Sequence, residues 1–204
     1  MDWLYKISIT CFAASYAIVF VLEVSRVFFD VALRKFVRVG LTAAGLFAQA
    51  GMFAHLQATQ KDDYPITVMT GHSITEIILS PAHIDYTAID SPDYFVVISE
   101  DGLQKCRGRM EKLASSATLY AEESLELPAT AARVVRLPLV ATSKKANRLS
   151  IGVLALAAML RDSGLFPLEA LRDAITAFQR PAIAEVNLRA VEAGSAAINE
   201  AMVC

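Results

Sequence analysis

The residues with the chemistry for metal binding or catalysis are few in this 204-residue chain and widely spaced. Its imidazoles, at His55, His72 and His83, form no H-E-x-x-H pattern, which argues against a zinc site. The 3 cysteines include no C-x-x-C pair, so a zinc or iron–sulfur site built on cysteine spacing is excluded. We therefore predict no metal site and no catalytic residues in this chain.

Turn residues are the remaining candidates for contact with a ligand. Gly40 and Gly45 bracket the segment GLTAAG, which lies where a dinucleotide-binding turn would follow a first strand. The segment lacks the middle glycine that lets the backbone approach a pyrophosphate. Gly71 and Ser73 flank a second turn, and Asn147 opens a predicted helix. Such turns suit a nucleotide- or coenzyme A-binding module, and solvated turns are the competing interpretation.

The charged residues point to no catalytic pair. Glu122 and Glu123 are adjacent, would diverge on a strand, and are interpreted as a solvated acidic turn. Lys144, Lys145 and Arg148 are expected at a helix start, where the helix dipole disfavours cations. They therefore either face an acidic partner or an anion, or form a solvated basic turn. The net charge of −2 argues against nucleic acid as a partner.

The elements that must position these residues begin after the first quarter of the chain. Runs of β-branched and aromatic residues bounded by Gly, Pro, Ser or Asp are typical of strands. They predict strands over Ile66–Thr70, Ser73–Leu79, Tyr94–Ile98, Ala117–Ala121 and Arg133–Val140. Pro138 places the last strand at an edge or marks its end. Lys61–Pro65 is polar, ends in proline, and is interpreted as a turn.

Helix signals alternate with these strands. Apolar residues at steps of three and four predict helices over Glu100–Leu113, Ala146–Leu160 and Ala184–Ile198. Pro167 opens a further helix, Ser99 offers an N-cap, and Gly164 offers a C-terminal stop. Strands interleaved with helices predict an α/β domain with a doubly wound, mostly parallel sheet and a helical C-terminal tail.

The N-terminal segment carries the apolar excess that raises the mean hydropathy to +0.44. Ile7–Leu22 has no charged residue, and Arg26, Arg34 and Lys35 follow it. An apolar run followed by basic residues is typical of a membrane helix with its C-terminal side in the cytoplasm. We expect residues 1–35 to form an N-terminal apolar anchor that tethers a cytoplasmic domain, residues 36–204, to the inner face of the cytoplasmic membrane. A buried or partner-facing helix is the alternative.

A second apolar run, Gly40–Leu56, allows two interpretations. It is rich in Gly and Ala, and Gln49 and His55 interrupt it. As a second membrane span, it would form a hairpin with the first. As a soluble helix, it would follow a short strand over Phe36–Val39 and pack on the sheet, an order common at the start of α/β domains.

Several segments, taken in order, resemble the gamma subunit or domain of pyruvate and other 2-oxoacid:ferredoxin oxidoreductases. Gly71–Ser80 resembles the family's R-G-G-x-S-x-x-E-V-x-x-S stretch, and Ser91–Lys105 its PDVLIAMNQEALDK strand and helix. Ala146-Asn147 followed by Gly164–Leu171 is similar to AN…ALG…TGLVSLEAL, and Asn187–Gly194 to NLKAFEAG. The resemblance covers about residues 59–200. Each match is of low specificity, and their succession carries the resemblance.

The resemblance implies a gamma-type subunit of a thiamine-diphosphate-dependent enzyme, packed against the thiamine-binding subunits. Thiamine diphosphate, iron–sulfur clusters and coenzyme A would belong to the partner subunits, and ferredoxin would be an indirect partner. Val39–Gly45 keeps only scattered glycines of the family's G-x-G-G-Q-G, and Thr70 stands where the family has arginine. The first 57 residues loosely resemble paired spans of cytochrome c assembly proteins. A diverged, membrane-anchored scaffold or binding protein, or a nucleotide- or coenzyme A-binding module, is the alternative.

Overall fold

The computed structural model describes residues 32–63 and 73–201. The chain divides after Arg34, and the fold below is that of the unit Lys35–Cys204. The apolar run Ile7–Leu22 and the predicted strand Ile66–Thr70 lie outside the described residues. Within 32–63 and 73–201, no helix combines the length and hydropathy that crossing a bilayer requires.

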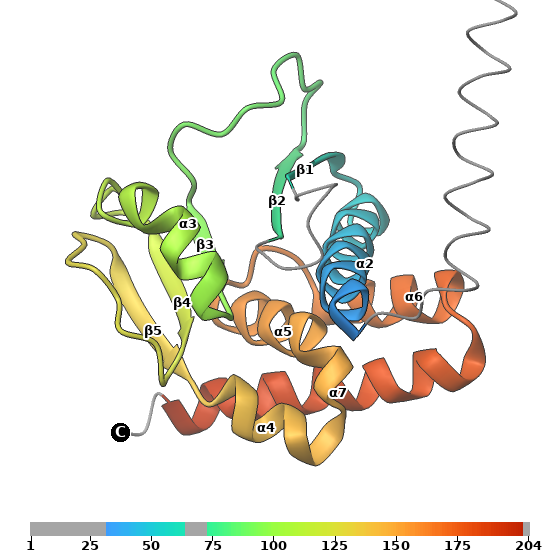
Figure 1. Cartoon of the computed structure of the whole chain (residues 1–204). Coiled ribbons are helices and arrows are strands. Elements are labelled where there is room, and N and C mark those ends of the chain that lie inside the picture. The colour runs from blue at the N-terminus through green and yellow to red at the C-terminus, as the bar shows by residue number, and fades with distance from the viewer. Residues whose placement is uncertain (1–31, 64–72, 202–204) are drawn as a thin grey trace, which may run out of the picture. The chain divides into compact units, whose positions relative to one another are not determined.

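This unit contains a parallel three-stranded sheet, labelled β3, β4 and β5 in Figure 1. Its strands, in spatial order, are β3 (Tyr94–Val97), β4 (Thr118–Glu122) and β5 (Arg133–Leu137). All three strands were predicted from their apolar runs, and the register pairs Val96 with Tyr120. β5 is an edge strand that ends just before Pro138, as this proline predicts.

The two faces of this sheet pack into two hydrophobic clusters. Tyr94 and Val96 pack with the larger cluster, which contains Tyr120. Val97 belongs to the smaller cluster with Leu119, on the opposite face. This alternation follows from the two-residue period of a strand. α3 (Glu100–Met110) covers the smaller cluster, and α5 (Ile151–Ser163) and α7 (Pro181–Ala201) supply much of the larger one. The predicted α/β fold with helices on both faces is confirmed for this sheet.

A separate antiparallel pair, β1 (Gln57–Asp63) and β2 (Ile74–Ser80), forms the second sheet. β2 was predicted, but the turn predicted over Lys61–Pro65 is wrong for Lys61–Asp63, which belongs to β1. The register explains this, because Lys61 lies opposite Glu76 and Asp62 lies opposite Thr75. The hydroxyl of Thr75 donates to Asp62 at 2.8 Å. Cross-strand pairing thus makes a strand of a polar segment.

α2 (Ala32–Phe53) replaces the strand predicted over Phe36–Val39, and that prediction is wrong. Ala43, Leu46, Phe47 and Ala50 are buried at steps of three and four residues, so this part of the helix has an apolar face that packs on the larger cluster. Helix propagation is cooperative. The packed C-terminal half of α2 therefore extends toward the N-terminus through Phe36–Val39, the segment predicted to be a strand. Gly40–Leu56 is therefore mostly helical, as both interpretations expected, but the strand that the soluble interpretation placed before it is not formed.

The first helix after the parallel sheet was not predicted. α4 (Leu139–Ala146) begins directly after Pro138 and is followed by a 3-10 turn, η1 (Arg148–Ser150). The Glu122 carboxylate accepts a hydrogen bond from the Val140 backbone N–H at 2.8 Å and is only 3% exposed. The solvated turn predicted for Glu122 is therefore wrong, because this side chain satisfies a donor at the start of α4.

The basic residues near this helix also lie differently from expectation. Lys144 and Lys145 lie in the last turn of α4, where a helix dipole favours cations. The helix start predicted at Ala146 is wrong, because Ala146 is the last residue of α4. Asn147 instead separates α4 from η1, and its side chain accepts a hydrogen bond from the Leu149 N–H at 2.8 Å. The long helix predicted from Ala146 thus begins as α5 at Ile151.

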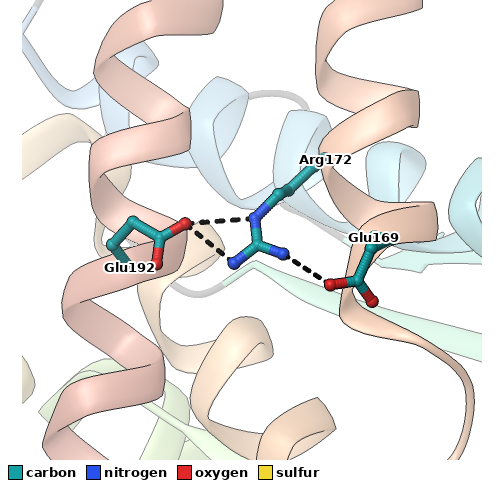
Figure 2. A network of polar contacts seen from close by, with 3 residues as sticks. All are labelled: Glu169, Arg172 and Glu192. Carbon is teal, nitrogen blue, oxygen red and sulfur yellow. Dashed lines mark hydrogen bonds and ion pairs between the residues drawn. The ribbon is translucent and has the colours of Figure 1, made fainter.

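The C-terminal helices form a packed layer, as predicted. α5 ends at Gly164, whose φ of 62° is the left-handed conformation that favours glycine. α6 (Leu168–Phe178) begins after Pro167, and α7 begins at Pro181. Figure 2 shows Arg172 of α6 between Glu169 of the same helix and Glu192 of α7. This ion-pair network joins α6 to α7 on their exposed side.

Candidate functional site

A cavity of about 560 Å³ lies between β2 and β3. We call it the β2–β3 groove. α2 contributes Ala43 and Phe47 to its wall, and α5 contributes Leu156 and Met159. α3 contributes Arg109, together with its neighbours Gly102 and Cys106. Its volume lies in the range of small-molecule sites, ~300–1,000 Å³. Its walls are mostly apolar side chains together with the backbones of two strands.

The β2–β3 groove is lined by four charged residues, of which Arg109 and Glu76 form an ion pair; the other two are Asp90 and Asp93. Arg109 Nη1 lies 2.8 Å from Glu76 Oε1, and Arg109 Nη2 donates to the Ile89 carbonyl at 3.3 Å. Lys61 Nζ lies 3.9 Å from the other Glu76 oxygen. Glu76 is largely buried, with a side-chain exposure of 17%. The guanidinium is thus already held by a carboxylate and a carbonyl, which makes the groove a poor anion site.

The thiol of Cys106, a residue that lines the groove, is not activated as a nucleophile. Cys106 is buried and free, and burial raises the pKa of its thiol, against the opposing effect of Arg109 and Lys105. A thiol with a raised pKa is protonated at neutral pH and reacts slowly. Ser99 lines the groove, but its hydroxyl oxygen accepts a hydrogen bond from Gly102 N at 3.3 Å. Both side chains therefore have structural roles.

The other titratable residues offer no catalytic arrangement among the described residues. His83 Nε2 lies 3.6 Å from Asp85, but both side chains are more than three-quarters exposed, at 81% and 90%. Glu122 is committed to Val140 and Ser124. Across 32–63 and 73–201, no three His, Cys, Asp or Glu side chains gather where they could hold a metal ion. The described donor set thus fits neither a metal centre nor an iron–sulfur cluster.

The turn residues proposed from sequence do not converge on one site. Gly40 and Gly45 lie inside α2, so the strand-to-helix turn expected there is not formed. Gly71 lies outside the described residues. Ser73 lines the β2–β3 groove, whereas Asn147 lies at the junction of α4 and η1 and is absent from the groove wall. A ligand role for these residues stays a prediction, with Ser73 the single member at the cavity.

Glu76 and Arg109, the two charged residues that form an ion pair in the groove, were not predicted as site residues. Glu76 stands in a run that reads simply as a strand, and Arg109 in a helix rich in exposed cations. Their pairing joins β2 to α3, which are separated in sequence by the irregular segment 81–93 and by β3. A contact across such a loop has no local sequence signal.

A parallel sheet with a hydrophobic cluster on each face defines a mixed α/β domain. The chain belongs to the pyruvate ferredoxin/flavodoxin oxidoreductase family, which matches residues 39–197. This match confirms the family resemblance drawn from the ordered segments after residue 59. It gives no support to the resemblance of the N-terminal segment to cytochrome c assembly proteins.

Individual relatives agree with this assignment. The chain is 25% identical over 170 residues to the 2-oxoglutarate synthase subunit KorC of Methanothermobacter thermautotrophicus, covering 79% of this chain and 90% of KorC. It is similar in fold to the gamma subunit of a keto/oxoacid ferredoxin oxidoreductase from Geobacter sulfurreducens, with a TM-score of 0.65, 20% identity, and coverage of 78% and 90%. A 2-oxoglutarate:ferredoxin oxidoreductase from Magnetococcus marinus, solved with 2-oxoglutarate, coenzyme A and succinyl-CoA, gives a TM-score of 0.66 at 15% identity. There, the match covers 78% of this chain and 28% of that one.

Proposed function

We propose that this chain is a non-catalytic, gamma-type subunit of a 2-oxoacid:ferredoxin oxidoreductase. The observation that carries the proposal is the family match over residues 39–197, together with relatives named as subunits that the chain covers almost end to end. The chain covers 90% of KorC and 90% of the Geobacter gamma subunit, so the likeness extends over most of the length of each relative.

The geometry supports a role in assembly. Among the described residues, the buried polar side chains are engaged with one another or with the backbone. Large apolar side chains are exposed at Met52, Phe53, Phe178 and Ile183. The rings of Phe53 and Phe178 are in contact, with centroids 6.0 Å apart. Exposed apolar and aromatic residues are enriched where subunits meet.

The cofactors of the reaction belong to the other subunits under this proposal. Thiamine diphosphate would carry out 2-oxoacid decarboxylation, and iron–sulfur clusters would pass the electrons to ferredoxin. Coenzyme A would accept the acyl group, in keeping with the coenzyme A and succinyl-CoA bound by the Magnetococcus enzyme. The part of this chain is to pack against the thiamine-binding subunits.

For localisation, the proposal is a cytoplasmic domain tethered to the membrane through the first 35 residues. Its support is the uncharged run Ile7–Leu22 followed by Arg26, Arg34 and Lys35. A carbonate wash of native membranes tests it directly. Retention of the full chain, with release of a variant lacking residues 1–31, is the expected result. Equal release of both forms would overturn the tether and leave the subunit assignment intact.

Purification of the tagged full chain from its native host tests the subunit assignment. After extraction with mild detergent, thiamine-binding and iron–sulfur subunits should co-elute. The eluate should reduce ferredoxin when given coenzyme A and a 2-oxoacid, with pyruvate and 2-oxoglutarate as the two trial substrates. Elution of the chain alone, or only with membrane proteins, would contradict the proposal and favour the diverged scaffold.

A further inference from the structure

Basic residues are concentrated in one part of this chain. Residues 127–161 contain six basic side chains and no acidic one, although the whole chain has 21 acidic and 19 basic residues. Lys144, Lys145 and Arg148 lie within five positions of one another, at the end of α4 and in η1. At protein interfaces, a surface of one charge is matched by a partner of the opposite charge.

A buried contact brings a fourth cation to the same region. The Ser150 hydroxyl donates to Asn187 Oδ1 at 2.6 Å, and Asn187 Nδ2 donates to Gln179 Oε1 at 2.8 Å. These two hydrogen bonds join η1 to the α6–α7 junction, near the start of α7, and α4 packs beside α7 (Figure 1). Arg148 lies two residues before Ser150, and Arg180 follows Gln179. Both arginines are therefore at the same end of α7.

We call Lys144, Lys145, Arg148 and Arg180 the basic corner. All four are exposed, and within residues 32–63 and 73–201 their side chains make no ion pair or hydrogen bond. The last turn of α4 favours its two lysines. Arg180, in contrast, lies at the positive end of α7, whose first turn has no acidic residue. The described fold thus leaves the charge of the basic corner without a partner.

Two exposed apolar side chains flank the same buried contact. Leu149 precedes Ser150 and is 46% exposed, and Ile183 lies one turn before Asn187 and is 51% exposed. Protein interfaces combine apolar residues at the centre with polar and charged residues at the rim. Nucleic acid or a free anion would use the cations and leave both apolar side chains in water. The combination therefore favours a protein segment that carries both carboxylates and apolar side chains.

The undescribed residues of this chain lack the carboxylates for this role. Residues 64–72 and 202–204 contain no acidic residue. Residues 1–31 contain Asp2, Glu23 and Asp30, of which no two are closer than seven positions. Isolated carboxylates at this spacing cannot match a cluster of four cations. The charge of the basic corner therefore points to a segment outside this chain.

A second copy of this chain is also a poor occupant. Two basic corners that face each other would repel, so a twofold contact through this surface is disfavoured. The acidic pair Glu100-Asp101 at the start of α3 could meet the basic corner of another copy only head to tail. Such a contact repeats from copy to copy and builds rings or open filaments. A different subunit avoids both problems.

We propose that the basic corner binds an acidic, partly apolar segment of a neighbouring subunit of the oxidoreductase. This proposal rests on the proposed function and names the chemistry of one contact that it requires. Carboxylates of the segment pair with the four cations, and its apolar side chains cover Leu149 and Ile183. Because exposed charges steer association, the basic corner selects and orients the partner more than it adds affinity.

Carbodiimide crosslinking in the native complex tests the proposal. The reagent joins a lysine amine to a carboxylate as an amide when the two are in direct contact, and the carbodiimide takes up the water released. The tagged full chain is purified with its partner subunits and crosslinked, and the joined peptides are identified by mass spectrometry. The matched variant is Lys144→Arg with Lys145→Arg, which keeps both charges and removes both reactive amines.

Lys144 and Lys145 should form amides with Asp or Glu residues of one segment of a partner subunit. The double arginine variant should lose these crosslinks and retain the complex. Crosslinks only to this chain's own carboxylates, in the same copy or in a second one, would overturn the proposal. Absence of crosslinks from both lysines in an intact complex would overturn it too, while leaving the proposed function standing. If no oxidoreductase subunit co-purifies, both fail together.

Charge reversal gives a second measurement. Lys144→Glu with Lys145→Glu should lower recovery of the crosslinked subunit by about tenfold or more, equivalent to ~1.4 kcal/mol or more of binding free energy. The control is Lys105→Glu with Lys112→Glu, which changes the net charge equally at two exposed lysines in and just after α3. Equal recovery with the two variants, each shown to be folded by circular dichroism, would contradict the proposal. Release of an intact complex from membranes by the first variant would identify anionic lipid as the partner and overturn it as well.

Discussion

Gly194 of α7 lies so close to Leu154 of α5 that a Cβ atom on Gly194 would be 2.2 Å from the Leu154 carbonyl oxygen. The obstacle is backbone, which cannot rotate away as a side chain can. The contact lies between α5 and α7, which both contribute to the larger cluster. The absence of a side chain at Gly194 therefore sets the distance between α5 and α7.

Gly194→Ala should destabilise the fold for this reason. Forcing a methyl group into a packed core costs about 1–3 kcal/mol. Gly108→Ala is the control, because a Cβ there meets nothing within 4 Å. In the interior of α3, that change should stabilise by ~0.5–1 kcal/mol. Urea unfolding of both variants measures the difference, and a stable Gly194→Ala protein would show that the helices can separate without loss.

Glu122→Ala should destabilise the start of α4. The substitution removes the acceptor of the Val140 N–H and leaves a part-buried donor unpaired, which costs about 1–3 kcal/mol. The neighbour Glu123 is exposed, so Glu123→Ala should change the free energy of unfolding by less than ~0.5 kcal/mol. Chemical denaturation of both variants decides whether Glu122 acts as a cap. Similar values for the two would contradict this role.

Tyr120 should make the fold sensitive to alkaline pH. Its buried hydroxyl donates to Asp162 at 2.7 Å, and burial, followed by this hydrogen bond, raises the pKa of Tyr120 well above its ordinary value of about 10. Above pH ~10, the unfolded chain loses this proton while the native state keeps it. The free energy of unfolding should therefore fall by up to ~1.4 kcal/mol per pH unit above pH ~10.

Tyr120→Phe should remove this component of the pH dependence. At neutral pH, the variant should lose about 1 kcal/mol, because Asp162 keeps its ion pair with Arg133. The free energy of unfolding is measured from about pH 8.5 to about pH 11, a range that brackets the ordinary tyrosine pKa of ~10, and its slope against pH is compared between the variants. Tyr86→Phe is the control, since it removes an exposed hydroxyl without touching the Asp162 network. The same slope in wild type and Tyr120→Phe would disprove the assignment.

The Arg172 network in Figure 2 should contribute little. Arg172 Nε and Nη2 lie 3.0 and 2.8 Å from Glu192 Oε1, but the Glu192 side chain is 64% exposed. Exposed ion pairs are worth about 0–1 kcal/mol and weaken with salt. Arg172→Met should therefore cost under ~1 kcal/mol in low salt and less at ~1 M salt. A loss that does not change with salt would indicate packing rather than charge.

The elements that the sequence predicted correctly are those with local signals. β3 is a continuous apolar run, and α3 follows an N-cap serine whose hydroxyl does accept the expected hydrogen bond. α5 ends at Gly164 because only a glycine adopts that conformation without strain. Each of these features depends on a few neighbouring residues, so it can be recognised without knowledge of the tertiary fold.

The elements that were missed depend on distant partners. β1 is polar and exists as a strand through its register with β2, which no pattern within Gln57–Asp63 reveals. The role of Glu122 depends on its contact with Val140, in the first turn of α4 and 18 residues away. The β2–β3 groove arises from two strand edges that belong to different sheets. Periodicity identifies the faces of a strand, but it does not identify which edges stay unpaired.

The outer edges of the three-stranded sheet differ in a way that bears on biosynthesis. Among the described residues, neither β5 nor β3 pairs with a further strand on its outer edge; β5 carries Arg133 and Arg136, whereas β3 is the apolar run YFVV. In a copy synthesised before its partner subunits, the arginines would thus disfavour strand pairing at the β5 edge, whereas the apolar β3 edge would favour pairing with another chain. Chaperones and proteases recognise such surfaces, so surplus copies would be cleared until partner supply matches theirs. The open edge would then act as a check on subunit stoichiometry.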